Sequence, residues 1–192
     1  MRKVGVGLSA TGLSRRLGGW RRDEAGATAV EFAMVSTPFL MFIFGLVGLA
    51  LYFFIMNSVE KGMDEASRLI RTGQAVTAKM TVDQFKQKIC SGAGPWVRCN
   101  NLQVFVTRFS DWASVTRQSC LDQNGAVVAN PAKGSDQIAT YSGTASDIVI
   151  VTACYKWTFT AHIPFLHLGN MNDKSMMMQT ATAFRSEPYL GT

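Results

Sequence analysis

The chain of 192 residues is long enough for about one to one-and-a-half domains. Apolar residues make up 47% of it and charged residues only 17%, a composition that excludes a highly charged disordered protein. The formal net charge is +6, of which residues 1–26 carry +4 and the remaining 166 residues +2. A nucleic-acid-binding protein spreads its basic residues over a folded surface. This uneven distribution therefore predicts no nucleic-acid partner.

A long uncharged segment follows the basic N-terminal region. Residues 32–59 are 28 consecutive positions without Asp, Glu, Lys or Arg. As a helix at ~1.5 Å per residue they extend about 42 Å, more than the ~30 Å of a bilayer's hydrocarbon core. We therefore predict a membrane-spanning helix over about residues 32–59. Because residues 1–26 are basic while acids and bases balance in residues 60–71, the positive-inside rule places the N-terminus in the cytoplasm and the C-terminal part across the membrane.

Two cleavable export signals are poorer interpretations of this region. The uncharged segment is far longer than the roughly 7–15 apolar residues of a secretory signal, and no small-x-small cleavage site directly follows it. The sequence Ser14-Arg15-Arg16-Leu17 faintly resembles a twin-arginine signal, but the charged residues 21–24 separate it from the apolar segment. A membrane-spanning helix remains the better interpretation.

A single carboxylate, Glu31, lies at the edge of the apolar segment, after the small residues Gly26 and Ala27 and before Phe32. An ionisable group within or beside a span is costly, about 2.5–3.5 kcal/mol for Asp at the helix centre and less near the interface. Glu31 therefore has either a charged partner or simple access to water. The residues alone leave both interpretations open.

The apolar residues become periodic after the span. They recur at the spacing of one helix face: Val59, Met63, Ala66 and Ile70. The same helix is therefore expected to continue as an amphipathic one, with Gly73 as its end. Thr81-Val-Asp-Gln84 has the pattern of a capping box and predicts a second, short helix that ends at about Cys90.

Three later segments have the alternation or the β-branched and aromatic content of strands, namely residues 102–109, 147–160 and 176–184. In the second, the odd-numbered residues from Val149 to Phe159 are expected to face a packed helix. The connection 110–146 is rich in Ser, Asn, Asp and Gly, and connections of such length are usually functional or poorly ordered. The predicted fold class is α+β: a long N-terminal helix, a short helix and a small antiparallel sheet.

Three parts are expected: a basic cytoplasmic segment over residues 1–26, a long helix over residues 27–73 that includes the span, and an exported α+β domain over residues 74–192 with the long loop 110–146.

All four cysteines lie beyond the span, at positions 90, 99, 120 and 154. An even number in an exported domain favours disulfides, and four cysteines allow three pairings. We favour Cys90–Cys99 and Cys120–Cys154, the second of which attaches the long loop to the central strand. A zinc site is the alternative, but there is no C-x-x-C pair, and His162 and His167 have no ligand at the usual spacing. No metal is expected.

Several motifs together resemble a known family. The first motif resembles the prepilin-peptidase site of type IV pilin-like proteins: Gly26 is followed by four residues, then by Glu31-Phe32, and then by a long apolar helix. This resemblance implies that residues 1–26 are a prepilin leader. The segment 22–34 resembles more specifically the TadE-like minor pilins, or pseudopilins, of tight-adherence (Tad) pili. Residues 65–75 and 181–189 are similar to the segments after the membrane helix and at the chain end of that family. The resemblance touches both ends of the chain beyond the leader, and its middle is not distinctive.

The resemblance implies a processing step and an assembly role. A prepilin peptidase is expected to cut between Gly26 and Ala27, which places Glu31 at the fifth position of the processed chain beside Phe32. The Glu31 carboxylate is then expected to pair with the new α-amino group of a neighbouring subunit. The implied partners are the major pilin, other minor pilins, the inner-membrane pilus assembly platform and the lipid bilayer. The implied location is the inner membrane, with a periplasmic C-terminal domain, and the extracellular pilus.

Catalysis is not expected, because no nucleophile, base or phosphate-loop constellation is recognisable, and no cofactor is predicted. Two alternatives to a pilin remain open. One is an uncleaved, single-span periplasmic scaffold of a secretion or pilus machine. The other is a membrane-tethered enzyme or thiol-redox protein, which requires a reactive free cysteine. Trp96, Trp112 and Trp157 are candidates for interface anchors, although core packing is expected for at least one of them.

Overall fold

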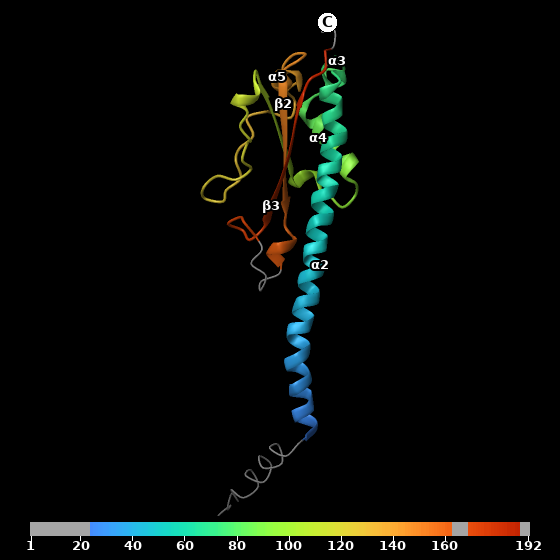
Figure 1. Cartoon of the computed structure of the whole chain (residues 1–192), viewed down its shortest axis with the longest axis vertical. Helices are drawn as coiled ribbons and strands as arrows, with labels where there is room; N and C mark the ends of the chain where they lie inside the picture. Colours follow the sequence, from blue (N-terminus) through green and yellow to red (C-terminus); the bar gives the residue numbers. More distant parts are fainter. Residues whose placement is uncertain (1–23, 163–168, 189–192) are drawn as a thin grey trace, which may run out of the picture. The chain divides into compact units, whose positions relative to one another are not determined.

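A computed structural model describes residues 24–162 and 169–188 (Figure 1). The chain divides between Ala50 and Leu51 into two compact units, so that the first long helix begins in one unit and ends in the other. Each unit is described by itself. The second unit, from Leu51 onward, is called the head.

Helix α2 (Glu24–Arg71) accounts for the whole described part of the first unit and continues into the head. It runs through Pro38 as one helix of 48 residues. Within the described residues, α2 is the helix that is long and apolar enough to cross a membrane. The predicted long N-terminal helix is thus confirmed. It ends just before Gly73, where the left-handed backbone (φ 75°) terminates it.

The head contains a three-stranded antiparallel sheet of order β1-β2-β3. Its strands are β1 (Leu102–Phe109), β2 (Ile148–Trp157) and β3 (Met176–Arg185). This confirms the predicted α+β fold class. The expectation that Phe159 continues the central strand is wrong: β2 ends at Trp157, and Phe159 begins the short helix η3 (Phe159–His162). The reason is pairing, because β1 begins opposite Tyr155 and β3 begins opposite Trp157, which leaves later residues without a neighbouring strand.

One face of the sheet packs on helices α2 and α4 (Val82–Ala93), with the four-residue helix α3 (Gln74–Thr77) between them in the chain (Figure 1). The predicted face of α2 is buried there, since Val59, Met63, Ala66 and Ile70 are all at most 2% exposed. Helix α4 begins with the predicted capping box, in which Thr81 and Gln84 each bond the other's backbone N–H. It extends three residues beyond the expected end at Cys90.

Helices α2 and α4 approach each other at two glycines. A Cβ on Gly62 of α2 would overlap the carbonyl oxygen of Ile89 and lie 2.7 Å from the backbone nitrogen of Ala93, both in α4. A Cβ on Gly92 of α4 would lie 2.9 Å from the Cα of Gly62. The two backbones can be this close only because both positions lack a side chain.

The long connection 110–146 contains the short helices η2 (Trp112–Ser114) and α5 (Ala139–Ser142). Its Cys120 packs with Phe105, Cys154 and Met177 of the three strands in a second cluster, whereas its later part, with Ile138 and Tyr141, packs in the main core beside α4. Disulfides join Cys120 to Cys154 of β2 and Cys90 of α4 to Cys99 of the short helix η1 (Cys99–Asn101). These are the pairs that the sequence analysis favours. Cys120–Cys154 attaches the connection directly to the central strand.

Candidate processing and assembly site

The candidate site lies in the first three turns of α2. Gly26, Ala27, Glu31 and Phe32 are all helical and exposed. A Cβ on Gly26 would meet nothing within 4 Å, so no packing in the described chain requires glycine there. Ala27 and Glu31 are one helical turn apart and therefore share a face of α2. The peptide bond between Gly26 and Ala27 is thus exposed and lies one helical turn from the Glu31 carboxylate.

Glu31 makes no ion pair with any residue that the structure describes. Next to it, Phe32 has 73% of its surface exposed. A carboxylate at the border of an apolar helix is stabilised by water or by a cation from outside the chain. The described residues therefore leave Glu31 available for an external partner.

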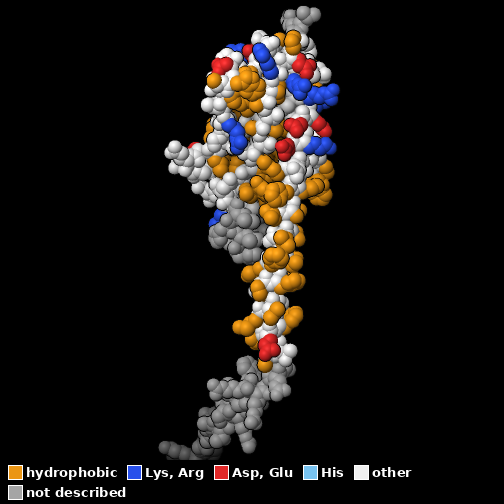
Figure 2. All heavy atoms as spheres, viewed as in Figure 1, with side chains coloured by type: hydrophobic (Ala, Val, Ile, Leu, Met, Phe, Trp, Pro, Cys, Tyr) orange, Lys and Arg blue, Asp and Glu red, His pale blue; other side chains and the backbone are white. Residues whose placement is uncertain are grey.

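An apolar surface follows this site along α2. Figure 2 shows hydrophobic side chains along the part of α2 that precedes the head. The exposed large side chains in this stretch include Phe39, Phe42, Phe44, Leu46 and Leu49. The hydroxyl groups of Ser36 and Thr37 donate to the carbonyl oxygen of Ala33, at 3.3 and 2.7 Å, so these polar groups are satisfied within the helix. Such a surface suits lipid or other apolar helices and is costly in water.

The two other segments that carry the family resemblance meet in the head. Arg71, at the end of α2, accepts a hydrogen bond at its carbonyl oxygen from the backbone N–H of Glu187 (2.8 Å). Its guanidinium Nε lies 3.2 Å from Oε1 of the same Glu187. Both side chains are more than half exposed, so this ion pair contributes little stability. Together with the backbone hydrogen bond, it joins the segment after β3 to the last turn of α2.

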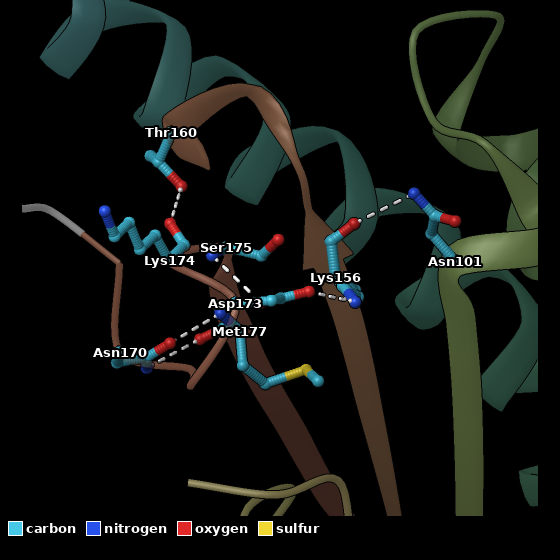
Figure 3. Close-up of polar contacts among 8 residues, drawn as sticks. All are labelled: Asn101, Lys156, Thr160, Asn170, Asp173, Lys174, Ser175 and Met177. Carbon is cyan, nitrogen blue, oxygen red and sulfur yellow. Dashed lines mark hydrogen bonds and ion pairs between the residues drawn. The ribbon is translucent and has the colours of Figure 1, made fainter. Parts of the chain in front are cut away.

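Two carboxylates of the head, Asp173 and Asp136, accept hydrogen bonds from neighbouring side chains. The Lys156 ammonium lies 2.5 Å from Asp173, and its hydrogen bond is the main cause that lowers the pKa of the Asp173 carboxyl (Figure 3). The hydroxyl of Tyr141 likewise lowers the pKa of Asp136. These partly exposed pairs join neighbouring segments of the head.

Metal and thiol chemistry find no support in the described residues. In residues 24–162 and 169–188, no group of three or more His, Cys, Asp or Glu side chains is arranged to hold a metal. All four cysteines are in disulfides. His162 is the last residue of η3, and His167 lies outside the described residues.

Sequence reasoning missed the Gly62–Gly92 contact and an aromatic cleft of the head. The cleft is lined by residues from four separate segments, among them Trp96 and Trp157. The sequence indicated it only through Trp96 and Trp157, which are candidates for interface anchors.

Comparison with known proteins adds one finding. No curated protein and no solved structure matches the chain. The model of the family described as TadE-like protein matches residues 26–68. That segment begins at Gly26, contains Glu31 and Phe32, and ends in the amphipathic part of α2. The resemblance to TadE-like pilins is thereby confirmed for residues 26–68 of this chain.

Proposed function

We propose that this protein is a minor pilin, or pseudopilin, of a Tad-type pilus and that it acts by assembly with other pilins. The observation that carries the proposal is the exposed apolar surface of α2 within the TadE-like segment 26–68. A helix that leaves most of its large apolar side chains uncovered needs lipid or neighbouring helices around it. A pilin meets both, first in the membrane and then in the filament. The disulfide-linked head presents a surface to the same partners.

Processing by a prepilin peptidase is the first step of the proposed function. Water hydrolyses the peptide bond between Gly26 and Ala27, which leaves a carboxylate on Gly26 and an α-amino group on Ala27. The reaction removes a leader with a formal charge of +4. The exposed helical position of Gly26 supports this step, because no described contact shields the bond.

Pairing between subunits is the second step. The Glu31 carboxylate of one subunit binds the Ala27 α-amino group of a neighbour in the apolar bundle of pilin helices. In a medium of low dielectric constant, an unpaired charge is strongly unfavourable. A subunit shifted along the bundle leaves both charges unpaired, so the pair selects one register. Glu31 is in this proposal an assembly residue and has no catalytic role.

The proposed location and partners follow from these steps. The unprocessed chain spans the inner membrane once, with the leader in the cytoplasm and the head in the periplasm. Its partners are the prepilin peptidase, the major pilin, other minor pilins and the inner-membrane assembly platform. The pilus built from them supports adhesion.

Substitution of the processing site tests the proposal. In the native host, Gly26→Val is expected to keep the full-length mass, because the branched side chain blocks the peptidase, whereas the unaltered protein begins at Ala27. Gly48→Val is the matched control, since a Cβ at Gly48 also meets nothing within 4 Å and α2 continues through both positions. Intact-mass measurement should find the full-length mass for Gly26→Val and the mass of a chain that begins at Ala27 for Gly48→Val.

A second variant separates processing from assembly. Glu31→Gln is expected to be cleaved at Gly26 and to be lost from sheared pili, because the α-amino group of the neighbour then has no anionic partner. An unaltered protein that still begins at Met1 contradicts the proposal. Full pilus function of Gly26→Val favours instead an uncleaved periplasmic scaffold.

A further inference from the structure

An aromatic cleft opens in the head where β2 ends. It has a volume of about 450 Å³. Its lining residues are Leu51, Ile55, Trp96, Arg98, Asn101, Tyr155, Trp157, Thr158 and Phe159. All of them belong to the head, and they come from α2, from the segment after α4, from η1 and from the end of β2. The sequence therefore builds this cleft from residues far apart in the chain.

Aromatic rings form both the wall and the rim of the cleft. Trp157 stacks on Phe159 with ring centres 5.4 Å apart, and Tyr52 lies 6.3 Å from Trp157. On α2, Phe54 meets Trp96 edge-on at 6.3 Å. Trp96 is 68% exposed although it is apolar over most of its surface. Exposed tryptophan and phenylalanine rings around an apolar cleft mark a contact surface.

A cation lies among these rings. The Arg98 side chain is exposed and has no ion pair with any described residue. Its backbone N–H donates to the Tyr155 hydroxyl (3.3 Å), which fixes the segment against β2. Lys156 of β2 pairs with Asp173, and its carbonyl oxygen accepts a hydrogen bond from Asn101, another residue of the cleft lining (Figure 3). Arg98 is thus free to bind an anion from outside the chain.

The position of the cleft along α2 indicates what occupies it. A span of about 20 helical residues that begins at residue 32 ends near Leu51. This is short of the last uncharged residue, Val59, which is buried in the head. Leu51 lines the cleft, and the exposed rings of Phe53 and Phe54 follow directly. Tryptophan and other aromatic rings concentrate at this level of a bilayer, and arginine binds phosphate there.

We propose that the cleft and its aromatic rim bind the outer surface of the lipid bilayer. The rings of Trp96, Trp157 and Phe159 enter the region of the upper acyl chains, and Arg98 binds lipid phosphate. The head then rests on the membrane that α2 crosses and is held there until the subunit leaves for the filament. This inference rests on the membrane span of the proposed function and adds a second membrane contact to it.

Tryptophan quenching in vesicles tests the contact. The full chain is reconstituted in phosphatidylcholine and phosphatidylglycerol vesicles whose acyl chains carry bromine near the headgroup. We compare Trp96→Phe with Trp112→Phe, since Trp112 is also exposed (58%) but follows the opposite end of β1. Trp96→Phe is expected to lose part of the bromine-quenched fluorescence. Trp112→Phe is expected to lose only fluorescence that bromine does not quench.

A charge variant and a flotation assay complete the test. Arg98→Gln is expected to weaken quenching of Trp96 by lipids that carry a nitroxide at the headgroup, whereas Arg117→Gln in the long loop is not. Equal losses in the two tryptophan variants, or quenching that appears only when a second pilin is added, overturn the inference. Flotation of the vesicles at alkaline pH tests the membrane span separately, because a spanning chain stays with the vesicles. A chain that floats with the vesicles but shows no quenching of Trp96 refutes the cleft contact alone. A chain that does not float refutes the span as well.

Discussion

Gly62 is a position at which the head has no room for a side chain. A Cβ there would meet the backbone of α4 at Ile89 and Ala93, which cannot move aside as a flexible side chain can. We expect Gly62→Ala to lower the free energy of unfolding of the head by about 1–3 kcal/mol, the usual cost of overpacking. Gly48→Ala is the control, since a Cβ there meets nothing within 4 Å. Thermal unfolding in detergent measures both, and equal midpoints would contradict the close helix contact.

Local residue patterns were predictable from the sequence, whereas contacts between distant residues were not. The candidate site at Gly26 and Glu31 is a motif within six positions, and the buried face of α2 follows from the spacing of its apolar residues. The need for glycine at Gly62 depends on Gly92, thirty positions later, and no local pattern links the two. The cleft around Trp157 was missed for the same reason.

Among the elements, the long connection 110–146 depends most on a covalent link. Cys120–Cys154 closes a sequence separation of 34 residues and Cys90–Cys99 one of only 9. Chain-entropy arguments give about 4 kcal/mol for the longer loop and about 2.5 kcal/mol for the shorter. We therefore expect the double variant Cys120→Ala/Cys154→Ala to be less stable in urea than Cys90→Ala/Cys99→Ala. Amide exchange should also increase around residue 120. The reverse order of stabilities would show that the connection is held mainly by its hydrogen bonds.

Element types were easier to predict than element ends. The strands were recognisable because alternation and β-branched residues are properties of each segment alone. The end of β2 was not, because it is set by where β1 and β3 begin. The connection 110–146 could not be judged at all from its composition. Its backbone is fixed by partners elsewhere, such as Val104, whose carbonyl oxygen accepts from the Asn130 side chain at 2.7 Å.

For the whole molecule, the distribution of charge is expected to decide which side of the membrane the head reaches. Residues 1–26, before the uncharged segment, carry a net charge of +4, whereas acids and bases balance in residues 60–71 after it. This is the asymmetry that keeps a basic flank in the cytoplasm. The cysteines report the outcome, because the two disulfides form in an oxidising compartment and not in the cytosol.

Neutralising the leader should therefore leave thiols reduced. Substitution of Arg15, Arg16, Arg21 and Arg22 by Gln removes the charge asymmetry, so a fraction of heads should stay in the cytoplasm. Alkylation of intact cells followed by mass measurement should then find chains with four modified cysteines. The control replaces four exposed bases of the head by Gln: Lys79, Lys88, Arg117 and Lys133. These lie too far beyond the uncharged segment to set its orientation, so both disulfides should form as in the unaltered chain. Complete disulfide formation in the leader variant as well would show that the head is exported by a signal other than the leader charge.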